Sequence, residues 1–410
     1  MNTRLRQDAD KITEYAINAV LPGEAVRRAL INTDLGESVY IVAVGKAGFS
    51  MAKAAAELVS YKKGIVITKY GHVNGKIRDF ECFEAGHPVP DDNGVYATGK
   101  VLELTEGLTE NDTVLFLLSG GGSALFEKPL VSLEELQDIT KQLLASGADI
   151  NEINTIRKRL SGVKGGRFAD KVYPAKIFSI ILSDIVGDPL DMIASGPTVA
   201  DTSTTGMALD IIQRYGITLS REAKMLMDTE TPKEVTNSEN QVIGSVRELC
   251  NAAAVCCKEL GYETVFLSDS VCAEAREVGS MLGAIAQTHA GDGRKLAYIL
   301  GGETVVHIKG TGMGGRNQEI ACGAAGGISG LENTAVFSVG SDGTDGPTDA
   351  AGGYVDSDTL NTLDKMKVSF EEMFDNNDSY HILEKCGGLI KTGPTGTNVN
   401  DFSVVLIDRG

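Results

Sequence analysis

The sequence lacks the segments that insert a chain into a membrane or export it. It contains no run of 18 or more apolar residues, which excludes an ordinary transmembrane helix. Residues 1–10 are polar and of mixed charge, unlike a signal peptide. The seven cysteines form no CxxC pair and the five histidines show no metal spacing, so we expect reduced, buried thiols and no disulfide framework. Together these absences predict a cytoplasmic protein.

Positive charge is also scarce. The chain has 38 Lys and Arg against 56 Asp and Glu, a net charge of −18, which argues against general binding to nucleic acid or an anionic membrane. A local basic pocket can still bind an anionic small molecule. Seven cations lie within residues 151–176, namely Arg157, Lys158, Arg159, Lys164, Arg167, Lys171 and Lys176. Lys164 and Arg167 flank a Gly-Gly hinge and are candidate substrate contacts, with a solvated helix face as the alternative.

Glycine, in contrast, is abundant, and it clusters after apolar runs. The chain has 48 glycines in 410 residues, a length that suits two domains. Buried strands alternate with helical segments in both halves, which indicates the α/β class. The polar stretch 227–240 has no apolar period. We therefore predict an N-terminal α/β domain at 1–230, a linker at 231–240 and a C-terminal α/β domain at 241–410.

The most informative stretch is an apolar run that enters a glycine-rich loop. Residues 114–118 are all apolar, which predicts a strand buried on both faces. The loop that follows can turn tightly and bring its amides and the next helix N-terminus to an anion. Its residues are Ser119, Gly120, Gly121, Gly122 and Ser123. The sequence therefore predicts either a phosphate or carboxylate site here or a plain strand-to-helix turn.

Two nucleotide-binding fingerprints are missing from the turn after the first strand. Gly45, Lys46 and Gly48 do not give the G-x-G-x-x-G spacing of a dinucleotide fold, nor the Gly-Lys-Ser/Thr of a Walker A loop. What is present is a lysine at a strand-to-helix turn, on the side of the sheet where ligands bind. Lys46 is therefore a candidate point charge for a phosphate.

Other polar side chains follow further strands. Asp184 and Asp188 come just after an apolar run at 177–182, where they could hold Mg²⁺ or a substrate hydroxyl, or cap a turn. His87 lies in a proline-containing loop and is a weaker substrate candidate.

The C-terminal half repeats this arrangement. Gly301, Gly302 and Glu303 follow one strand, and a glycine-rich stretch at 310–315 leads to Arg316, whose fork of donors suits a carboxylate or phosphate. The alternative for Arg316 is a surface pair with Glu319. After another strand, Asp342 and Asp345 lie in a loop that is either a metal site or a set of turn caps, and that lacks the EF-hand frame.

Glycine loops, cations and carboxylates after strands are the components that phosphoryl transfer needs. Amides and cations spread over the phosphate oxygens, and carboxylates hold Mg²⁺. No Ser-His-Asp or Cys-His set is apparent, which makes acyl transfer a poor fit. From the residues alone, we infer an α/β enzyme that handles phosphate.

Eight motifs, taken together, resemble the glycerate 2-kinases of the MOFRL type. They extend over nearly the whole chain and are VGKA at 44–47, SGGGSA at 119–124, SDIVGD at 183–188, ASGPT at 194–198, GGET at 301–304, GRNQE at 315–319, SDGTDG at 341–346 and NVND at 398–401. The resemblance implies phosphorylation of D-glycerate at its 2-hydroxyl by ATP with Mg²⁺, giving 2-phosphoglycerate and ADP. It also implies two Rossmann-like α/β/α domains with the active site in the interdomain cleft.

The resemblance also suggests roles for residues. Lys46 and Arg316 match the proposed active-site residues of the family, and we expect them to bind the glycerate carboxylate or the moving phosphoryl group. We expect the 119–123 loop, with Gly301, Gly302 and Glu303, to bind ATP phosphates. Asn317 joins His87, Lys164 and Arg167 as a candidate substrate contact.

The roles of the aspartates stay open. Either Asp184 and Asp188 or Asp342 and Asp345 would hold Mg²⁺, and one of them, with Asp184 as the catalytic candidate, would accept the hydroxyl proton. Two other functions are also open: an NAD(P)-dependent hydroxypyruvate reductase, against which the missing fingerprint argues, and a non-catalytic nucleotide-binding module. The sequence does not give the oligomeric state and leaves a homo-oligomer open.

Overall fold

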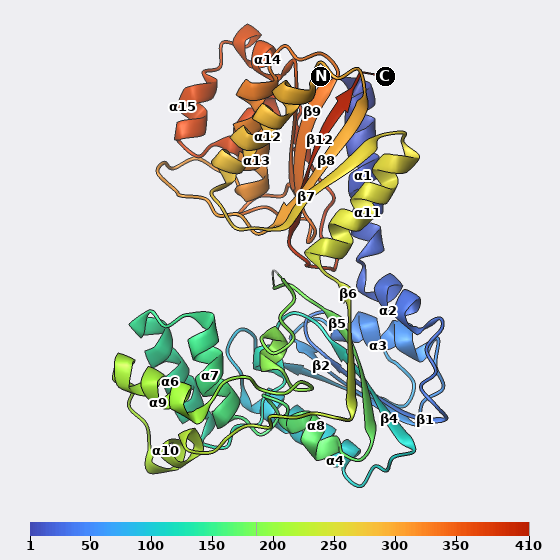
Figure 1. The fold of residues 1–410 in the computed structure, drawn as a ribbon, viewed down its shortest axis with the longest axis vertical. Coiled ribbons are helices and arrows are strands. Elements are labelled where there is room, and N and C mark those ends of the chain that lie inside the picture. Colours follow the sequence, from blue (N-terminus) through green and yellow to red (C-terminus); the bar gives the residue numbers. More distant parts are fainter. Residues whose placement is uncertain (186, 410) are drawn as a thin grey trace. The chain divides into compact units, whose positions relative to one another are not determined.

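The computed structural model describes residues 1–185 and 187–409, and the chain forms two compact units (Figure 1). The parallel-sheet unit contains Pro22–Ser183 and Asp188–Ile243. The mixed-sheet unit contains Met1–Leu21, Asp184–Gly187 and Gly244–Gly410. Each unit has one six-stranded sheet with helices packed on it, which confirms the predicted α/β class.

The sheet of the parallel-sheet unit has the strand order β3-β2-β1-β4-β5-β6. Neighbouring strands from β3 to β5 are all parallel, so their carboxyl ends share one edge. The central strands are apolar and buried, as expected for a sheet covered on both faces. The strands are β1 (Ser38–Val44), β2 (Lys63–Lys69), β3 (Phe80–Ala85), β4 (Asp112–Leu118), β5 (Lys176–Leu182) and β6 (Ser238–Gly244).

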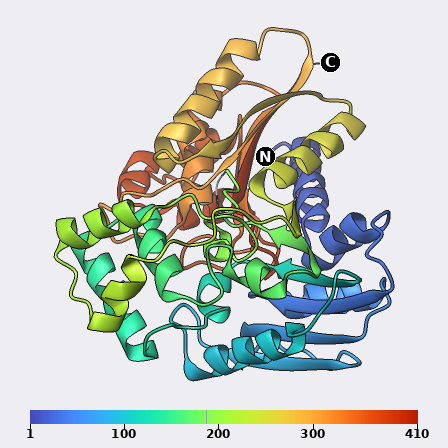
Figure 2. The same ribbon diagram turned by 60° about the horizontal axis from the view of Figure 1, so that its bottom comes forward.

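The helices of this unit form three groups. Helices α2 (Pro22–Leu30) and α3 (Gly48–Ala56) share a core with β1 and β4. Helices α4 (Asp92–Thr105), α5 (Gly122–Leu125) and α8 (Arg167–Val172) lie together, with Phe126 and Phe168 packing on Phe116 of β4. A separate cluster with its own apolar core (green in Figure 2) comprises α6 (Leu133–Ser146), α7 (Ile150–Leu160), α9 (Thr205–Tyr215) and α10 (Arg221–Met227).

The sheet of the mixed-sheet unit has the order β11-β10-β9-β12-β8-β7. The pair β7–β8 is parallel, and the other four neighbouring pairs are antiparallel. Because β12 runs opposite to β8 and β9, its first residue lies beside the last residues of both. The strands are β7 (Glu263–Val271), β8 (Lys295–Gly302), β9 (Thr334–Gly340), β10 (Gly352–Asp356), β11 (Leu389–Ile390) and β12 (Asp401–Asp408).

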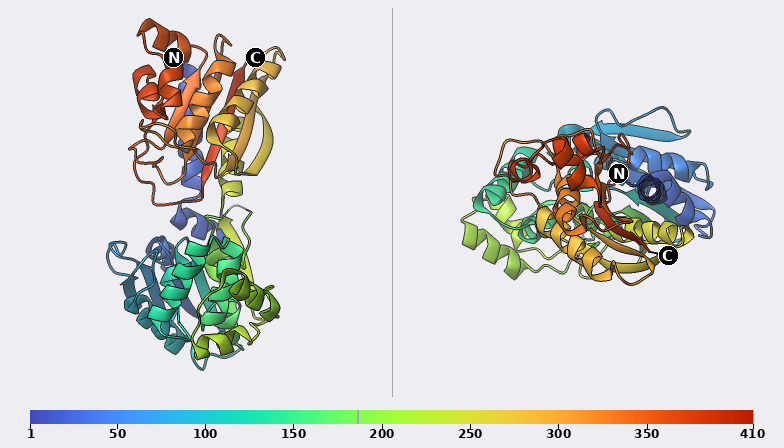
Figure 3. Two further views of the ribbon diagram at one scale, coloured as in Figure 1. Left: turned by 90° about the vertical axis from the view of Figure 1, so that its left-hand side faces the viewer. Right: turned by 90° about the horizontal axis from the view of Figure 1, so that it is seen from above.

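Two layers of helices cover this mixed sheet (Figure 3). One face carries α1 (Thr3–Ala19) and α11 (Val246–Glu259), whose apolar residues join one core. The other face carries α12 (Ala275–His289) and α13 (Arg316–Ile328), with α14 (Thr359–Lys365), α15 (Phe370–Asp375) and α16 (Ser379–Cys386) beyond them. Helices α12 and α13 pack so closely that a Cβ on Gly279 would lie 2.2 Å from the Ile320 carbonyl oxygen.

The unit boundaries differ from the predicted domain boundaries in two places. The first 21 residues belong with the C-terminal half, because Pro22 divides the helical stretch 4–30 into α1 and α2. Proline lacks an amide hydrogen and suits the first position of a helix, so it begins α2 and ends the preceding one. The predicted linker 231–240 is partly ordered structure: β6 begins at Ser238, and Thr231 is buried with its hydroxyl donating to Asp201. The polar sequence of β6 fits its place at the sheet edge.

Two expectations about side chains and segments can be checked directly. All seven cysteines are free thiols, and Cys250, Cys256, Cys257 and Cys322 are buried, as predicted. Among the described residues, no helix has both the length and the apolar character needed to cross a membrane.

Candidate functional site

The turns after β1 and β4 interlock at the carboxyl edge of the parallel sheet. Lys46 N donates to Gly120 O at 2.9 Å, and Ala47 N donates to Ser119 Oγ at 3.0 Å. Gly45 has φ +118°, and a Cβ there would lie 2.2 Å from Ser119 Oγ, so only glycine fits. This contact fixes the backbone at Lys46 while its side chain stays exposed to solvent.

Lys46 and His87 flank the middle of the 119–123 loop. A Cβ built on Gly121, whose φ is +90°, would lie 2.9 Å from His87 Cδ2 and 3.4 Å from Lys46 Cγ. Burial lowers the pKa of His87, and the positive charge of Lys46 lowers it further. The structure thus brings together Lys46, His87 and the glycine loop, in surroundings that favour the neutral form of His87.

The segment after β5 packs onto the same loop. A Cβ on Gly122 would lie 2.8 Å from Ala194 Cβ, and Ala194 and Ser195 have φ of 50° and 62°. Positive φ is costly for residues other than glycine and must be held by surrounding contacts. Ser195 Oγ donates to Asn154 Oδ1 of α7 at 2.9 Å, which is one such contact. Sequence reasoning missed Asn154, because nothing in its local pattern signals a partner 41 residues away.

The two aspartates of this segment have different surroundings. Asp184 lies in the mixed-sheet unit, where its backbone carbonyl accepts from Asn400 Nδ2 at 3.2 Å. Asp188 has φ 50°, and its buried Oδ1 has no hydrogen-bond partner among the described residues. An unpartnered buried carboxylate oxygen is costly, which makes Asp188 a candidate ligand for a cation. The intervening Val186 lies outside the described residues.

Lys164 is not open to a substrate, whereas Arg167 is partly exposed. Lys164 is fully buried, and its Nζ donates to Phe126 O at 2.9 Å and forms an ion pair with Glu127 at 3.5 Å. Burial lowers the pKa of Lys164 to about 8. Arg167 donates to the carbonyls of Lys158, Arg159 and Ser161, which close the end of α7. The predicted substrate contact at Lys164 is therefore corrected to an internal structural one, and that at Arg167 stays a prediction.

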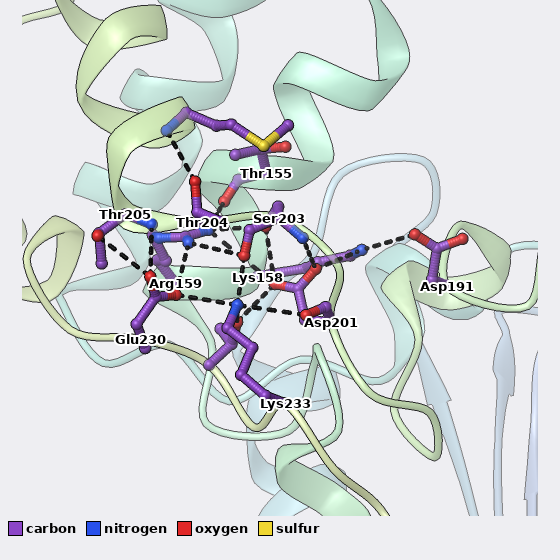
Figure 4. A network of polar contacts seen from close by, with 12 residues as sticks. Thr155, Lys158, Arg159, Asp191, Asp201, Ser203, Thr204, Thr205, Glu230 and Lys233 are labelled. Carbon is purple, nitrogen blue, oxygen red and sulfur yellow. Dashed lines mark hydrogen bonds and ion pairs between the residues drawn. The ribbon is translucent and has the colours of Figure 1, made fainter.

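The cations of α7 are likewise not a solvated face. Lys158 and Arg159 are buried in a polar network that joins α7 to residues 201–205 and 230–233 (Figure 4). Lys158 forms ion pairs with Asp191 and Asp201, and Arg159 with Asp201 and Glu230. The network connects the green helical cluster to the segment that precedes β6.

In the mixed-sheet unit, Arg316 is held by two acids. Asp401 starts β12 between Gly302 and Gly340, and it accepts from Arg316 Nε and, at 3.2 Å, from Nη2. Arg316 Nη1 donates to Glu303 Oε1 at 3.1 Å. Burial raises the pKa of Asp401, and the guanidinium of Arg316 opposes that rise. The alternative of an Arg316–Glu319 pair is wrong, because Glu319 pairs with Arg276 at 3.7 Å.

The aspartates of the 341–349 loop act as caps. Asp345 Oδ1 accepts from Asn317 N at 3.1 Å and Oδ2 from Gln318 N at 2.8 Å, which caps the N-terminus of α13. Asp342 Oδ1 accepts from the amide and hydroxyl of Thr344. Asn317 is buried, with Ser338 Oγ donating to its Oδ1 at 2.6 Å, so it supports the cap from inside the fold. These contacts are those of the predicted turn caps, and they use both oxygens of Asp345 and one oxygen of Asp342.

The glycines near Arg316 are explained by close backbone approach. A Cβ on Gly302 would lie 2.2 Å from Val271 O of β7, and one on Gly301 would lie 2.5 Å from Cys250 Sγ. The 309–315 stretch is pinned, because Asn377 Oδ1 accepts from Lys309 N and Gly310 N and Asp378 Oδ1 accepts from Met313 N. Of the predicted phosphate contacts in this unit, only Glu303 is exposed, and its carboxylate faces Arg316.

Comparisons with known proteins agree along the whole chain. Residues 8–228 match the family described as a domain of unknown function (DUF4147), and residues 296–401 match the MOFRL family. The chain is 52% identical to the D-glycerate 2-kinase of Thermotoga maritima and 38% identical to a glycerate 2-kinase of Pyrococcus horikoshii. These alignments cover 98% of this chain in both cases, and 98% and 97% of the relatives.

A solved structure extends the agreement to the fold. The crystal structure of the glycerate kinase of Thermotoga maritima matches 99% of this chain and 100% of that protein, with a TM-score of 0.94 at 51% identity. Sequence identity at this level over full length places the chain in one family with these enzymes. The chain belongs to the glycerate 2-kinase family, with a DUF4147 domain followed by a MOFRL domain.

Proposed function

We propose that this chain transfers the terminal phosphoryl group of ATP to the 2-hydroxyl of D-glycerate, giving 2-phosphoglycerate and ADP. The observation that carries the proposal is the interlocked pair of turns at the carboxyl edge of the parallel sheet, in a chain 52% identical to a D-glycerate 2-kinase. Ligands of α/β sheets bind at this edge. Amides of a glycine-rich turn and an exposed lysine there suit phosphate oxygens.

Residues of both units take part in the proposal. The 119–123 loop binds the phosphates of ATP, and Lys46 neutralises the charge that develops on the transferring group. Arg316 presents a fork whose orientation is fixed by Asp401. Asp184 is the proposed acceptor of the hydroxyl proton. The location of the active site in an interdomain cleft stays a prediction.

Mg²⁺ accompanies the nucleotide in this proposal. Among the described residues, no group of three or more His, Cys, Asp or Glu side chains is arranged to hold a metal. Magnesium in kinases is typically held by one or two carboxylates together with substrate phosphates, so such a group is not required. Asp188, with its unpartnered Oδ1, fits this role better than Asp345, whose two oxygens cap α13, and than Asp342, one of whose oxygens caps a turn. Mg²⁺ would supply charge neutralisation for the phosphate oxygens.

One assay tests this function. ADP release would be followed with ATP, Mg²⁺ and D-glycerate, and the product isomer would be identified by phosphorus NMR. We expect 2-phosphoglycerate, with turnover that requires D-glycerate. ATP binding without turnover would favour a nucleotide-binding module, and oxidation of NADH or NADPH with hydroxypyruvate would favour the reductase. Either result would overturn the proposal.

A further inference from the structure

Helix α7 carries two arginines, two residues apart, with opposite surroundings. Arg159 has Asp201 and Glu230 as ion-pair partners and donates to Thr155 O and Ser203 Oγ, both at 2.9 Å. Arg157 forms no ion pair with an Asp or Glu of the described residues. Arginine stays charged in proteins, so Arg157 places a cation in the parallel-sheet unit without an ion-pair partner among the described residues.

The donors of Arg157 are mostly unused. Its Nη2 donates to Ser123 O at 2.8 Å, and its Nε is buried without a hydrogen-bond partner in the part of the chain that the structure describes. Burial lowers the pKa of Arg157, and Glu127 is the acid that opposes this effect. Glu127, however, is the ion-pair partner of Lys164. A half-buried cation with a buried, unpartnered Nε is costly to the fold, and such groups cluster at ligand sites.

The position of Arg157 points to one particular ligand chemistry. Ser123, to which it donates, is the last residue of the 119–123 loop and lies in α5. Asn154, one helical turn earlier on α7, holds Ser195 in the segment that packs on Gly122. One face of α7 therefore contacts two of the turns that form the carboxyl edge of the parallel sheet. A planar guanidinium there matches two oxygens of a carboxylate or phosphate.

We propose that Arg157 is a substrate-binding residue that takes an oxyanion of the reactants beside the 119–123 loop. The proposal rests on the proposed kinase function for the identity of that oxyanion, which is either the carboxylate of D-glycerate or a phosphate of ATP. Because Glu127 is already paired with Lys164, a bound anion adds negative charge beside Arg157. Lys158 and Arg159 have their own acids and keep their structural role.

Binding and kinetics together test this role. The thermal stabilisation of the protein would be measured with D-glycerate and, separately, with inorganic tripolyphosphate, because a ligand that binds the native state raises Tm. The variant Arg157→Gln keeps an amide donor for Ser123 O but removes the charge. Arg214→Gln is the matched control, since Arg214 of α9 is exposed and pairs with Glu152 of α7, the helix that carries Arg157.

We expect Arg157→Gln to weaken binding of one of the two probes roughly ten- to hundredfold and to raise KM for the matching substrate. Loss of the D-glycerate effect assigns the carboxylate, and loss of the tripolyphosphate effect assigns a phosphate. The control should keep both wild-type responses. If Arg157→Gln does not fold, Arg157→Lys keeps the charge without the fork and should still raise one KM.

Three results separate this proposal from the proposed function. Wild-type constants and stabilisation by both probes in the folded variants would overturn the role of Arg157 and leave the kinase intact. A wild-type protein that neither probe stabilises would also overturn it. Stabilisation that depends on Arg157, in a protein without glycerate kinase turnover, would support the anion site while the proposed function fails.

Discussion

The two units contain glycine-rich loops that look alike in sequence but differ in how their charges are balanced. Around the 119–123 loop, Lys46 and Arg157 have no ion-pair partner among the described residues. Next to the 309–315 loop, Arg316 is held by Asp401 and Glu303. The first loop therefore leaves cations available to an anion, whereas the second uses acids of the protein to orient its arginine.

The backbone amides of the two loops also differ in how far other residues of the protein occupy them. Residues 309–315 are bound by side chains of Asn376, Asn377 and Asp378, so their amides are largely occupied by the protein. The 119–123 loop is anchored at Ser119 and Gly120 and packed at Gly122. A strand followed by glycines and a cation is therefore not sufficient to identify an anion site. The availability of the donors decides it.

The strongest test of this comparison is Lys46→Met. If Lys46 stabilises charge on the transferring group, kcat should fall roughly 10²- to 10³-fold, the loss typical for one positioned donor. Tm should stay unchanged, because the side chain is exposed. Lys53→Met, on the exposed surface of α3, is the matched control and should keep wild-type kinetics. Wild-type kcat in Lys46→Met would show that Lys46, beside the first loop, does not stabilise charge on the transferring group.

The second test is Arg316→Lys. Lysine offers a point charge in place of the fork that Asp401 holds, and losing one charge-assisted bond costs about 1.5–3 kcal/mol, or roughly ten- to hundredfold in kcat/KM. A fall in kcat indicates contact with the transferring group, and a rise in KM indicates ground-state binding. Arg294→Lys breaks a similar but exposed pair with Glu263 and should change neither constant. Equal effects in both variants would mean that Arg316 is structural.

The sequence predicted the strand-ending loops of the candidate site better than the ion pairs around them. The strand-ending loops, Lys46, His87 and Arg316 follow from apolar runs and glycines that are local in the chain. The partner of Arg316 does not, because Asp401 lies 85 residues away and is placed there by the register of β12 between β8 and β9. Burial is equally non-local, so the pattern around Lys164 predicted a substrate contact or a solvated face where the fold forms an internal ion pair.

The same reason explains the errors in domain boundaries. Helical period and polar composition describe a segment but not the surface it packs against. Residues 3–19 have an apolar face that is completed by α11 and the mixed sheet, more than 200 residues later in the chain. Likewise, Arg157 and Arg159 are near neighbours in sequence with opposite surroundings, which side-chain direction on α7 and the position of Asp201 determine.

The pH dependence of stability tests the protonation of Asp345, which caps α13 after the second loop. Burial raises the pKa of Asp345 from 3.8 to about 7. Between these values the unfolded chain binds fewer protons, so this contribution is fully present below about pH 4 and lost as pH rises through 7. We expect Asp345 to reduce the free energy of unfolding by about 1.4 kcal/mol between pH 5 and pH 6.

Denaturant unfolding of the wild type and Asp345→Asn at both pH values measures this contribution. The variant should lose this part of the pH slope, although it also loses one of the two bonds that cap α13. Asp342→Asn, in the turn nearby, is the control and should keep the wild-type slope. A wild-type slope in Asp345→Asn would show that Asp345 is ionised in the folded protein at pH 5.

The smallest expected effect is that of Glu303→Gln, which tests whether the acid paired with Arg316 competes with a substrate oxyanion. Glu303 is about half exposed, and its pair with Arg316 is expected to be worth about 0–1 kcal/mol. If an incoming oxyanion binds Arg316 Nη1 in place of Glu303, removing the carboxylate charge should lower KM for that substrate by up to about fivefold, since 1.4 kcal/mol is tenfold. Steady-state kinetics with each substrate varied in turn, after a check that Tm is within a few degrees of the wild type, would measure this. A KM that rises instead would mean that Glu303 helps to bind the reactants, and the second loop would then use its acid as well as its arginine.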